Sequence, residues 1–99
     1  MNNIYNFKAK LWLYPGKAAW VFVNVPEKVT AEIDYFHTHN KRGFGSLPVI
    51  VTVGDTEWKT SIFPHKKDKI YILPIKKLVR TQENIEVGDN VSFQIIINS

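Results

Sequence analysis

The stretch VIVTVGDTEWKTSI, residues 49–62, decides the fold of this chain. Two runs of strand-forming residues, 49–53 and 56–62, flank the pair Gly54-Asp55. A Gly-containing pair between two such runs is typical of a tight β-hairpin. The segment therefore predicts two antiparallel strands joined by a two-residue turn.

The register of this hairpin predicts which side chains face the core. If Val53 pairs with Thr56, Val51 lies opposite Trp58, and opposed residues share one face of the sheet. We expect Trp58 and Thr60 to point inward. The outward set on the second strand is then Glu57, Lys59 and Ser61.

Four further segments have strand patterns, which gives about six strands in all. Residues 7–14 alternate between apolar and polar, with Leu11 and Leu13 on the inner side, whereas residues 18–23 are apolar on both faces. A strand of the second kind must be covered on both faces, so we expect a helix over its outer face. The remaining two segments are a short strand over residues 70–73 and a final strand over residues 91–97. We expect a loop over residues 63–69.

Two short helices are predicted between the strands. The first begins near Pro26, and its apolar stripe is Val29, Ile33 and Phe36. The second begins at Pro74, with Ile75, Leu78 and Val79 as its buried stripe and Lys76, Lys77 and Arg80 as its opposite, cationic face. These elements predict a mainly β protein, a small β-barrel, with residues 1–99 forming a single domain.

Charge is distributed unevenly over the 99 residues, whose net charge is +4. Residues 41–80 contain nine Lys and Arg but three Asp and Glu. Such an excess favours an anionic partner, although a solvated basic face is the alternative. The chain has no Cys, which excludes disulfides and thiolate metal sites. With no signal-peptide pattern or membrane span, we expect a bacterial-type cytoplasmic protein.

The segment Lys41–Ser46, KRGFGS, has two readings. Gly43 and Gly45 could let backbone N–H groups converge on an anion held by the fork of Arg42. Alternatively, the glycines accommodate positive φ or a bulge while Phe44 plugs one end of the barrel. The sequence lacks the third glycine of a dinucleotide fingerprint and the Lys-Ser/Thr of a P-loop.

We expect five cations, Arg42, Lys59, Lys76, Lys77 and Arg80, to converge at one end of the barrel. In the proposed site, the guanidinium of Arg42 would form paired hydrogen bonds to the anion. The lysines and Arg80 would supply positive charge, and two serines would donate hydrogen bonds. The candidate ligand-binding residues are Arg42, Ser46, Lys59, Ser61, Lys76, Lys77 and Arg80.

Enzymatic and metal-binding readings are weaker. Ser61, His65 and Asp68 have the residue types of a nucleophile, base and orienting acid, but all lie within eight residues. His37 and His39 would diverge on a helix, and with His65 they are expected to be surface histidines. We predict no catalytic residue, no metal site and no cofactor.

The tryptophans raise the possibility of nucleic-acid binding by stacking. Trp20 and Trp58 fit the core, and Trp12 alone is expected to face outward beside Lys8 and Lys10. One exposed aromatic residue is not a stacking platform. The second helix also lacks the Asn or Gln that reads bases.

Several motifs together resemble one family. In chain order, GFGSLPV, WKTSIFP, YILPIKKLVR and IEVGDNVSF are similar to domain of unknown function 1905, a bacterial family, as are FKAKLW and AAWVFVNVP near the start. The resemblance covers about residues 7–97 and implies a small, partly split β-barrel with structural kinship to AbrB-type transcription factors. Family members sometimes have a second, porin-associated domain, and in residues 1–99 we expect none. The resemblance implies no activity.

Three functions follow, in this order. The first is a non-enzymatic barrel that binds a small anionic ligand or an acidic protein surface, and the second is a nucleic-acid-associated module with AbrB-like topology. An enzyme of unknown type is third. The sequence does not predict the ligand, the partner or the oligomeric state.

Overall fold

The structure is a computed structural model that describes residues 3–16, 19–37, 39, 41 and 43–98, except the side chain of Phe44. It is mainly β, as predicted. In chain order the elements are β1 (Ile4–Lys10), β2 (Trp12–Leu13), β3 (Val21–Asn24), α1 (Glu27–His37), a short 3-10 helix η2 (Gly43–Gly45), β4 (Leu47–Val53), β5 (Thr56–His65), β6 (Ile70–Pro74), α2 (Lys77–Glu83) and β7 (Asn90–Ile97).

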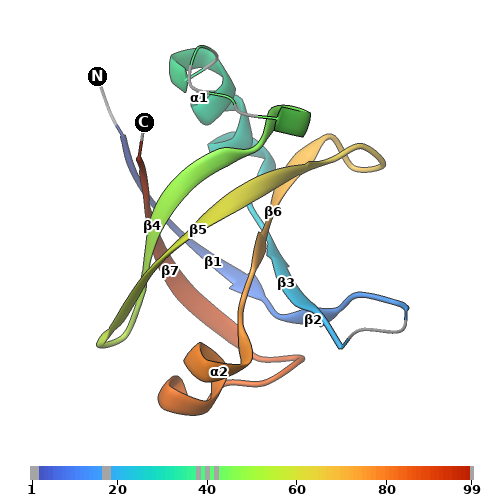
Figure 1. Ribbon diagram of the computed structural model, residues 1–99, viewed down its shortest axis with the longest axis vertical. Helices are drawn as coiled ribbons and strands as arrows, with labels where there is room; N and C mark the ends of the chain where they lie inside the picture. The colour runs from blue at the N-terminus through green and yellow to red at the C-terminus, as the bar shows by residue number, and fades with distance from the viewer. Residues whose placement is uncertain (1–2, 17–18, 38, 40, 42, 99) are drawn as a thin grey trace.

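The seven strands form one antiparallel sheet in the order β1-β7-β4-β5-β6-β3-β2, curled into a half-barrel (Figure 1). The two strands at the ends of this order, β1 and β2, are separated in the chain by Leu11 alone. One bent segment therefore runs from one edge of the sheet to the other, and the fold prediction of a small, partly split barrel is confirmed.

The bend at Leu11 explains why seven strands replace the expected six. Leu11 donates its N–H to Asp89 at 3.0 Å and accepts from Gly88 at 2.9 Å, so at this residue the chain leaves β7 and turns to β3. Leu11 is buried as predicted, but Leu13 beyond the bend is 53% exposed. The prediction of an inward Leu13 was wrong because the alternation of faces is interrupted at the bend.

The central hairpin has the predicted register. Val53 pairs with Thr56 and Val51 with Trp58, and Trp58 is buried. Gly54 has a φ of 55°, and Asp55 is not among the residues with positive φ, which matches a type II′ turn with glycine first.

β5 pairs with two different strands along its length. Its first part, Thr56–Ile62, pairs with β4, and its last part, Phe63–His65, pairs with β6. The expectation of a loop over residues 63–69 was thus wrong at its start, because Phe63–His65 finds partners in Ile70–Ile72. Below this short ladder β5 and β6 diverge (Figure 1).

The helix α1 packs on the barrel through a different stripe from the one predicted. Phe36 is 40% exposed, whereas Thr30, Ile33 and His37 are buried. The Thr30 hydroxyl accepts from the backbone N–H of Tyr71 in β6 at 3.3 Å, which turns this side of the helix inward. The predictions of a buried Phe36 and a surface His37 were therefore wrong.

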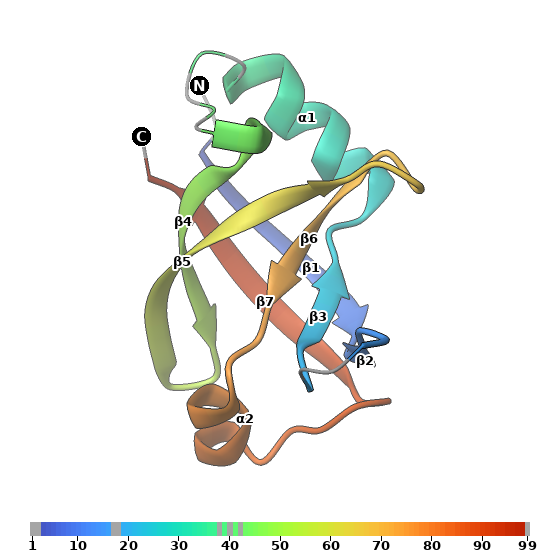
Figure 2. The ribbon, with the colours of Figure 1, turned by 45° about the vertical axis from the view of Figure 1, so that its right-hand side comes forward.

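The outer face of β3 is covered by aromatic side chains and not by the expected helix. α1 lies toward one end of the barrel (Figure 2). Phe22 is nevertheless only 5% exposed, because the rings of Trp12, Tyr14 and Trp20 lie with centroids 5.5, 5.6 and 6.0 Å from its own. Pairing of β2 with β3 places these rings together.

Candidate ligand-binding site

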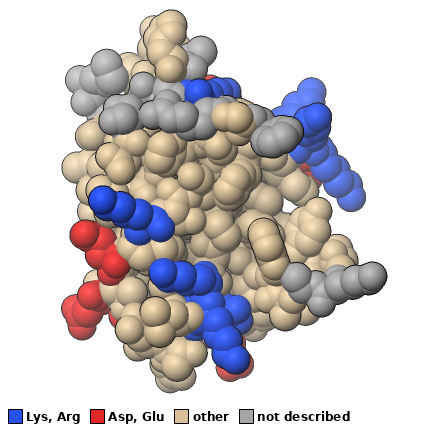
Figure 3. Space-filling model, viewed as in Figure 1, with Lys and Arg blue, Asp and Glu red and all other residues tan. Residues whose placement is uncertain are grey.

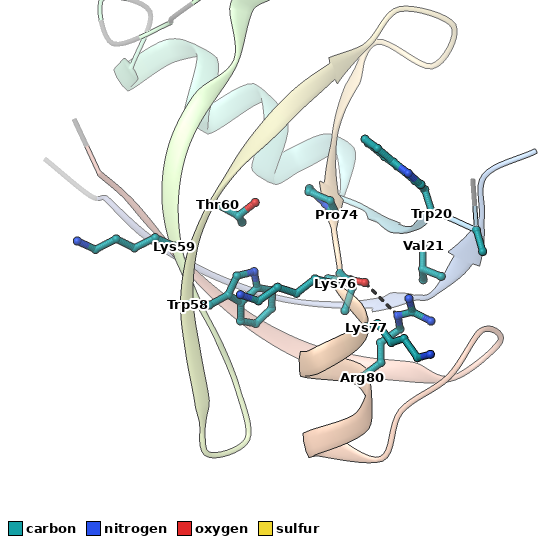
Figure 4. A pocket seen from close by; sticks show the side chains of 11 residues that line it. Trp20, Val21, Trp58, Lys59, Thr60, Pro74, Lys76, Lys77 and Arg80 are labelled. Atoms are coloured by element: carbon teal, nitrogen blue, oxygen red, sulfur yellow. Dashed lines mark hydrogen bonds between the residues drawn. The ribbon is translucent and has the colours of Figure 1, made fainter. Parts of the chain in front are cut away.

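The divergence of β5 and β6 leaves a hollow of about 400 Å³, which we call the basic hollow (Figure 4). Its apolar lining residues come from β3, β5, the end of β6 and the segments next to them in the chain. Its lower border is α2, which begins shortly after β6 ends. The lining residues central to its shape and charge are Val21, Trp58, Ile75, Lys76, Lys77 and Arg80.

The start of α2 is fixed by a backbone bond to β3, and its end is marked by a left-handed residue. Ile75 donates its N–H to Val21 at 2.8 Å before the helix begins, and Asn84 ends it in the left-handed conformation, with φ 54°. Ile75 and Val79 are buried as predicted, but Leu78 is 58% exposed. The prediction for Leu78 was wrong because Ile75 precedes the helix, so helical spacing does not relate the two residues.

The hairpin between β4 and β5 is tied to the far end of α2. The Thr56 hydroxyl donates to a Glu83 carboxylate oxygen at 2.6 Å. A Cβ added at Gly54 would lie 2.1 Å from the other oxygen of that carboxylate. The positive φ favours glycine here, and a side chain at this position would displace the flexible carboxylate of Glu83.

Three cations belong to the α2 side of the hollow. Lys76 and Lys77 are exposed, whereas Arg80 is partly buried and its Nε donates to the Ile75 carbonyl at 3.0 Å. Among the residues that the structure describes, none of the three forms a salt bridge with an acidic side chain. Figure 3 shows Lys and Arg side chains grouped low on the face that bears the opening.

Lys59 belongs to the hollow differently from the other three cations. Its side chain extends away from the opening in Figure 4, on the outward side predicted by the hairpin register. The adjacent residues Trp58 and Thr60 line the hollow with it. Lys59 is therefore part of the lining, but its charged group lies outside the opening.

The other predicted residues do not gather at this hollow. The Ser46 hydroxyl donates to the Gly43 carbonyl at 3.1 Å, beside η2 at the opposite end of the barrel (Figure 1). Ser61 pairs with Pro48 and faces outward. Lys59, Lys76, Lys77 and Arg80 thus lie around this hollow, with the Lys59 side chain directed away from its opening, whereas Ser46 and Ser61 lie nearer the α1 end.

The glycine segment between α1 and β4 is only partly described. Gly45 has a φ of 76°, which fits the prediction that a glycine accommodates positive φ here. Arg42 and the side chain of Phe44 lie outside the described residues, so the proposed fork and plug stay predictions.

A second hollow, of about 570 Å³, lies on the outer face of the sheet, and the sequence analysis missed it. We call it the aromatic hollow; it is lined by Tyr14, Pro15, Gly16, Trp20, Phe22, Phe63 and Ile72. Trp20 is 60% exposed and lines both hollows, which contradicts the expectation that Trp12 alone faces outward. The signal in the sequence was the spacing of Trp20 and Phe22, two residues apart, which places both rings on one face of an extended segment.

A polar cluster fastens α1 to β6 near the opposite end. The Tyr71 hydroxyl donates to Asp34 at 2.5 Å, and Lys41 lies 3.1 Å from the same carboxylate oxygen. Burial, followed by the hydrogen bond to Asp34 and its negative charge, raises the pKa of Tyr71. Tyr71 and Lys41 thus both pair with Asp34, and these contacts join α1 to β6.

The structure gives no geometric support to the catalytic arrangement considered above. Ser61 and His65 are four residues apart on β5, which separates them by about 13 Å along a strand. His65 Nδ1 does lie 3.1 Å from Asp68. Within the described ranges no group of three or more His, Asp or Glu is placed to hold a metal ion. No described helix is long and apolar enough to cross a membrane.

A comparison with protein families assigns the chain to one family. The model described as "Domain of unknown function (DUF1905)" matches residues 7–95. The chain belongs to the DUF1905 family. The match runs from β1 into β7, so both hollows lie within the DUF1905 region. No curated protein matches the chain.

Proposed function

We propose that this DUF1905 chain is a non-enzymatic binding domain for a small organic anion, held in the basic hollow. The observation that carries the proposal is the combination of a hollow of about 400 Å³ with apolar walls and a cationic border. Small-molecule sites have this character, with volumes of roughly 300–1,000 Å³, mostly apolar linings and a few polar groups that fix orientation.

The charges on α2 favour an anion over a neutral ligand. Lys76 and Arg80 are four residues apart at the start of α2, and like charges at this spacing destabilise a helix slightly. An anion between Lys76 and Arg80 would relieve that repulsion. The same border could meet an acidic protein surface, but a hollow of this size suits a small molecule better.

The ligand would bind with its apolar part against Trp58 and Ile75 and its charged group at the lysines. Arg80 is already oriented by its bond to the Ile75 carbonyl, so its position does not depend on the ligand. Lys76 and Lys77 are exposed and can adjust to the anion.

Calorimetric titration with butyl phosphate tests this proposal. We expect binding to the unmodified chain and its loss in Lys76→Gln/Lys77→Gln. The matched control is Lys66→Gln/Lys67→Gln, which removes two exposed neighbouring charges from the turn between β5 and β6 and should bind normally. Equal loss in both double variants would mean that only the net charge matters, and absence of binding at millimolar butyl phosphate would refute the proposal.

A further inference from the structure

The basic and aromatic hollows adjoin each other. Trp20 lines both. On β6, Ile72 lines the aromatic hollow and Pro74 the basic hollow, and two residues along a strand span about 7 Å. Because Trp20 is shared, a ligand of one ring with an attached anionic group is long enough to reach both.

The aromatic hollow has the chemistry of a stacking surface. Trp20 is 60% exposed and Tyr14 43%, yet both rings are held against the buried Phe22 at centroid distances of 6.0 and 5.6 Å. Phe63, 41% exposed, borders the same hollow from β5. Rings fixed in place lose little entropy when another ring packs on them.

We infer that the ligand of this site is a planar aromatic anion of about mononucleotide size, with its ring in the aromatic hollow and its phosphate or carboxylate at Lys76 and Lys77. The inference rests on the proposed function, since it assigns the same anion site and adds the ring. Charge complementarity selects this occupant: the apolar surface ends at a cationic border, which an uncharged apolar partner would leave unmatched.

A pair of matched probes separates the inference from the proposed function. Phenyl phosphate and butyl phosphate present the same anionic group on an aromatic and an aliphatic body. Stacking on an aromatic side chain is worth about 1–3 kcal/mol, which corresponds to roughly 5- to 150-fold in affinity. We expect phenyl phosphate to bind at least about 5-fold more tightly by calorimetry.

Variants at Trp20 locate this preference. Trp20→Ala should reduce the affinity for phenyl phosphate to that for butyl phosphate, and Trp20→Phe should restore most of the difference. The control Tyr35→Ala removes an aromatic side chain that is 82% exposed on α1, and it should change neither affinity. Equal binding of both probes to the unmodified chain would overturn the inference and leave the proposed function intact.

Two other outcomes would also overturn it. A ten-nucleotide single strand that binds far more tightly than a mononucleotide, with steep salt dependence, would identify a nucleic-acid strand as the occupant. Dimerisation that Trp20→Ala abolishes would identify a second copy of this chain.

Discussion

Tyr71→Phe tests how firmly α1 is fastened to the barrel, because it removes one hydroxyl and keeps the ring. The Tyr71 hydroxyl donates to Asp34, and only 2% of Tyr71 is exposed. A hydrogen bond to a charged group contributes about 1.5–3 kcal/mol. Asp34 keeps the ammonium of Lys41 at 3.1 Å, so the loss should lie at the lower end of this range. We expect urea unfolding at pH 7 to show a decrease of about 1.5 kcal/mol in the free energy of unfolding.

The same substitution should have the opposite sign at high pH. The pKa of Tyr71 is raised in the folded protein, whereas in the unfolded chain a tyrosine ionises near pH 10. The stabilisation from Tyr71 is therefore complete below pH 10 and is lost as the pH rises above it. The loss amounts to about 1.4 kcal/mol per pH unit, and Tyr71→Phe escapes it. The free energies of unfolding of Tyr71→Phe and of the unmodified protein should become equal near pH 11. Above this pH the variant should be the more stable of the two.

Urea unfolding at half-unit steps from pH 7 to 11.5 measures both effects. The control is Tyr35→Phe, which removes a hydroxyl from a side chain that is 82% exposed and should run parallel to the unmodified protein. A difference between Tyr71→Phe and the unmodified protein that stays constant over this range would refute the assignment of a raised pKa to Tyr71.

Three further predictions concern the elements that build the basic hollow, all measured by urea unfolding. Arg80→Ala should lower the free energy of unfolding by about 1.5–3 kcal/mol through loss of its bond to a backbone carbonyl, and an unchanged value would show that this bond is not stabilising. Val79→Ala should lower it by about 2 kcal/mol while Leu78→Ala, at an exposed position on the same helix, should change it by less than about 0.5 kcal/mol. Gly54→Ala should lower it by about 1–2 kcal/mol or more from positive φ and contact with Glu83, and part of this loss should disappear in a Glu83→Ala background; simple additivity would contradict the contact.

Local signals were sufficient for the strands and for the central register. Gly54-Asp55 fixed the turn, and alternation then placed Trp58 inside and Lys59 outside, as the structure confirms. These features depend on neighbours within a few residues. The cationic side of α2 was readable for the same reason, since Lys76, Lys77 and Arg80 lie within five positions of each other.

Features that depend on distant partners were not readable. Leu13 was expected inside, but Gly88 and Asp89 bend the chain at Leu11 and interrupt the alternation. Trp20 was assigned to the core because an apolar strand was assumed to need a helix above it. The structure covers the strand with rings from its own hairpin, and a ring on the outside of such a layer stays exposed.

The basic hollow follows from a change of partner within one strand. β5 follows β4 up to Ile62 and β6 from Phe63 onward, so it cannot stay close to both along its whole length. Pro74 ends β6 and has no N–H with which to extend the ladder, and the next N–H, that of Ile75, is donated across to Val21 of β3. The space between β5 and β6 therefore results from the way the strands pair, and not from small side chains along its walls. Because α2 begins immediately after this point, its lysines are placed at the opening by chain connectivity, and a ligand there would contact both the strand that diverges and the helix that borders the gap.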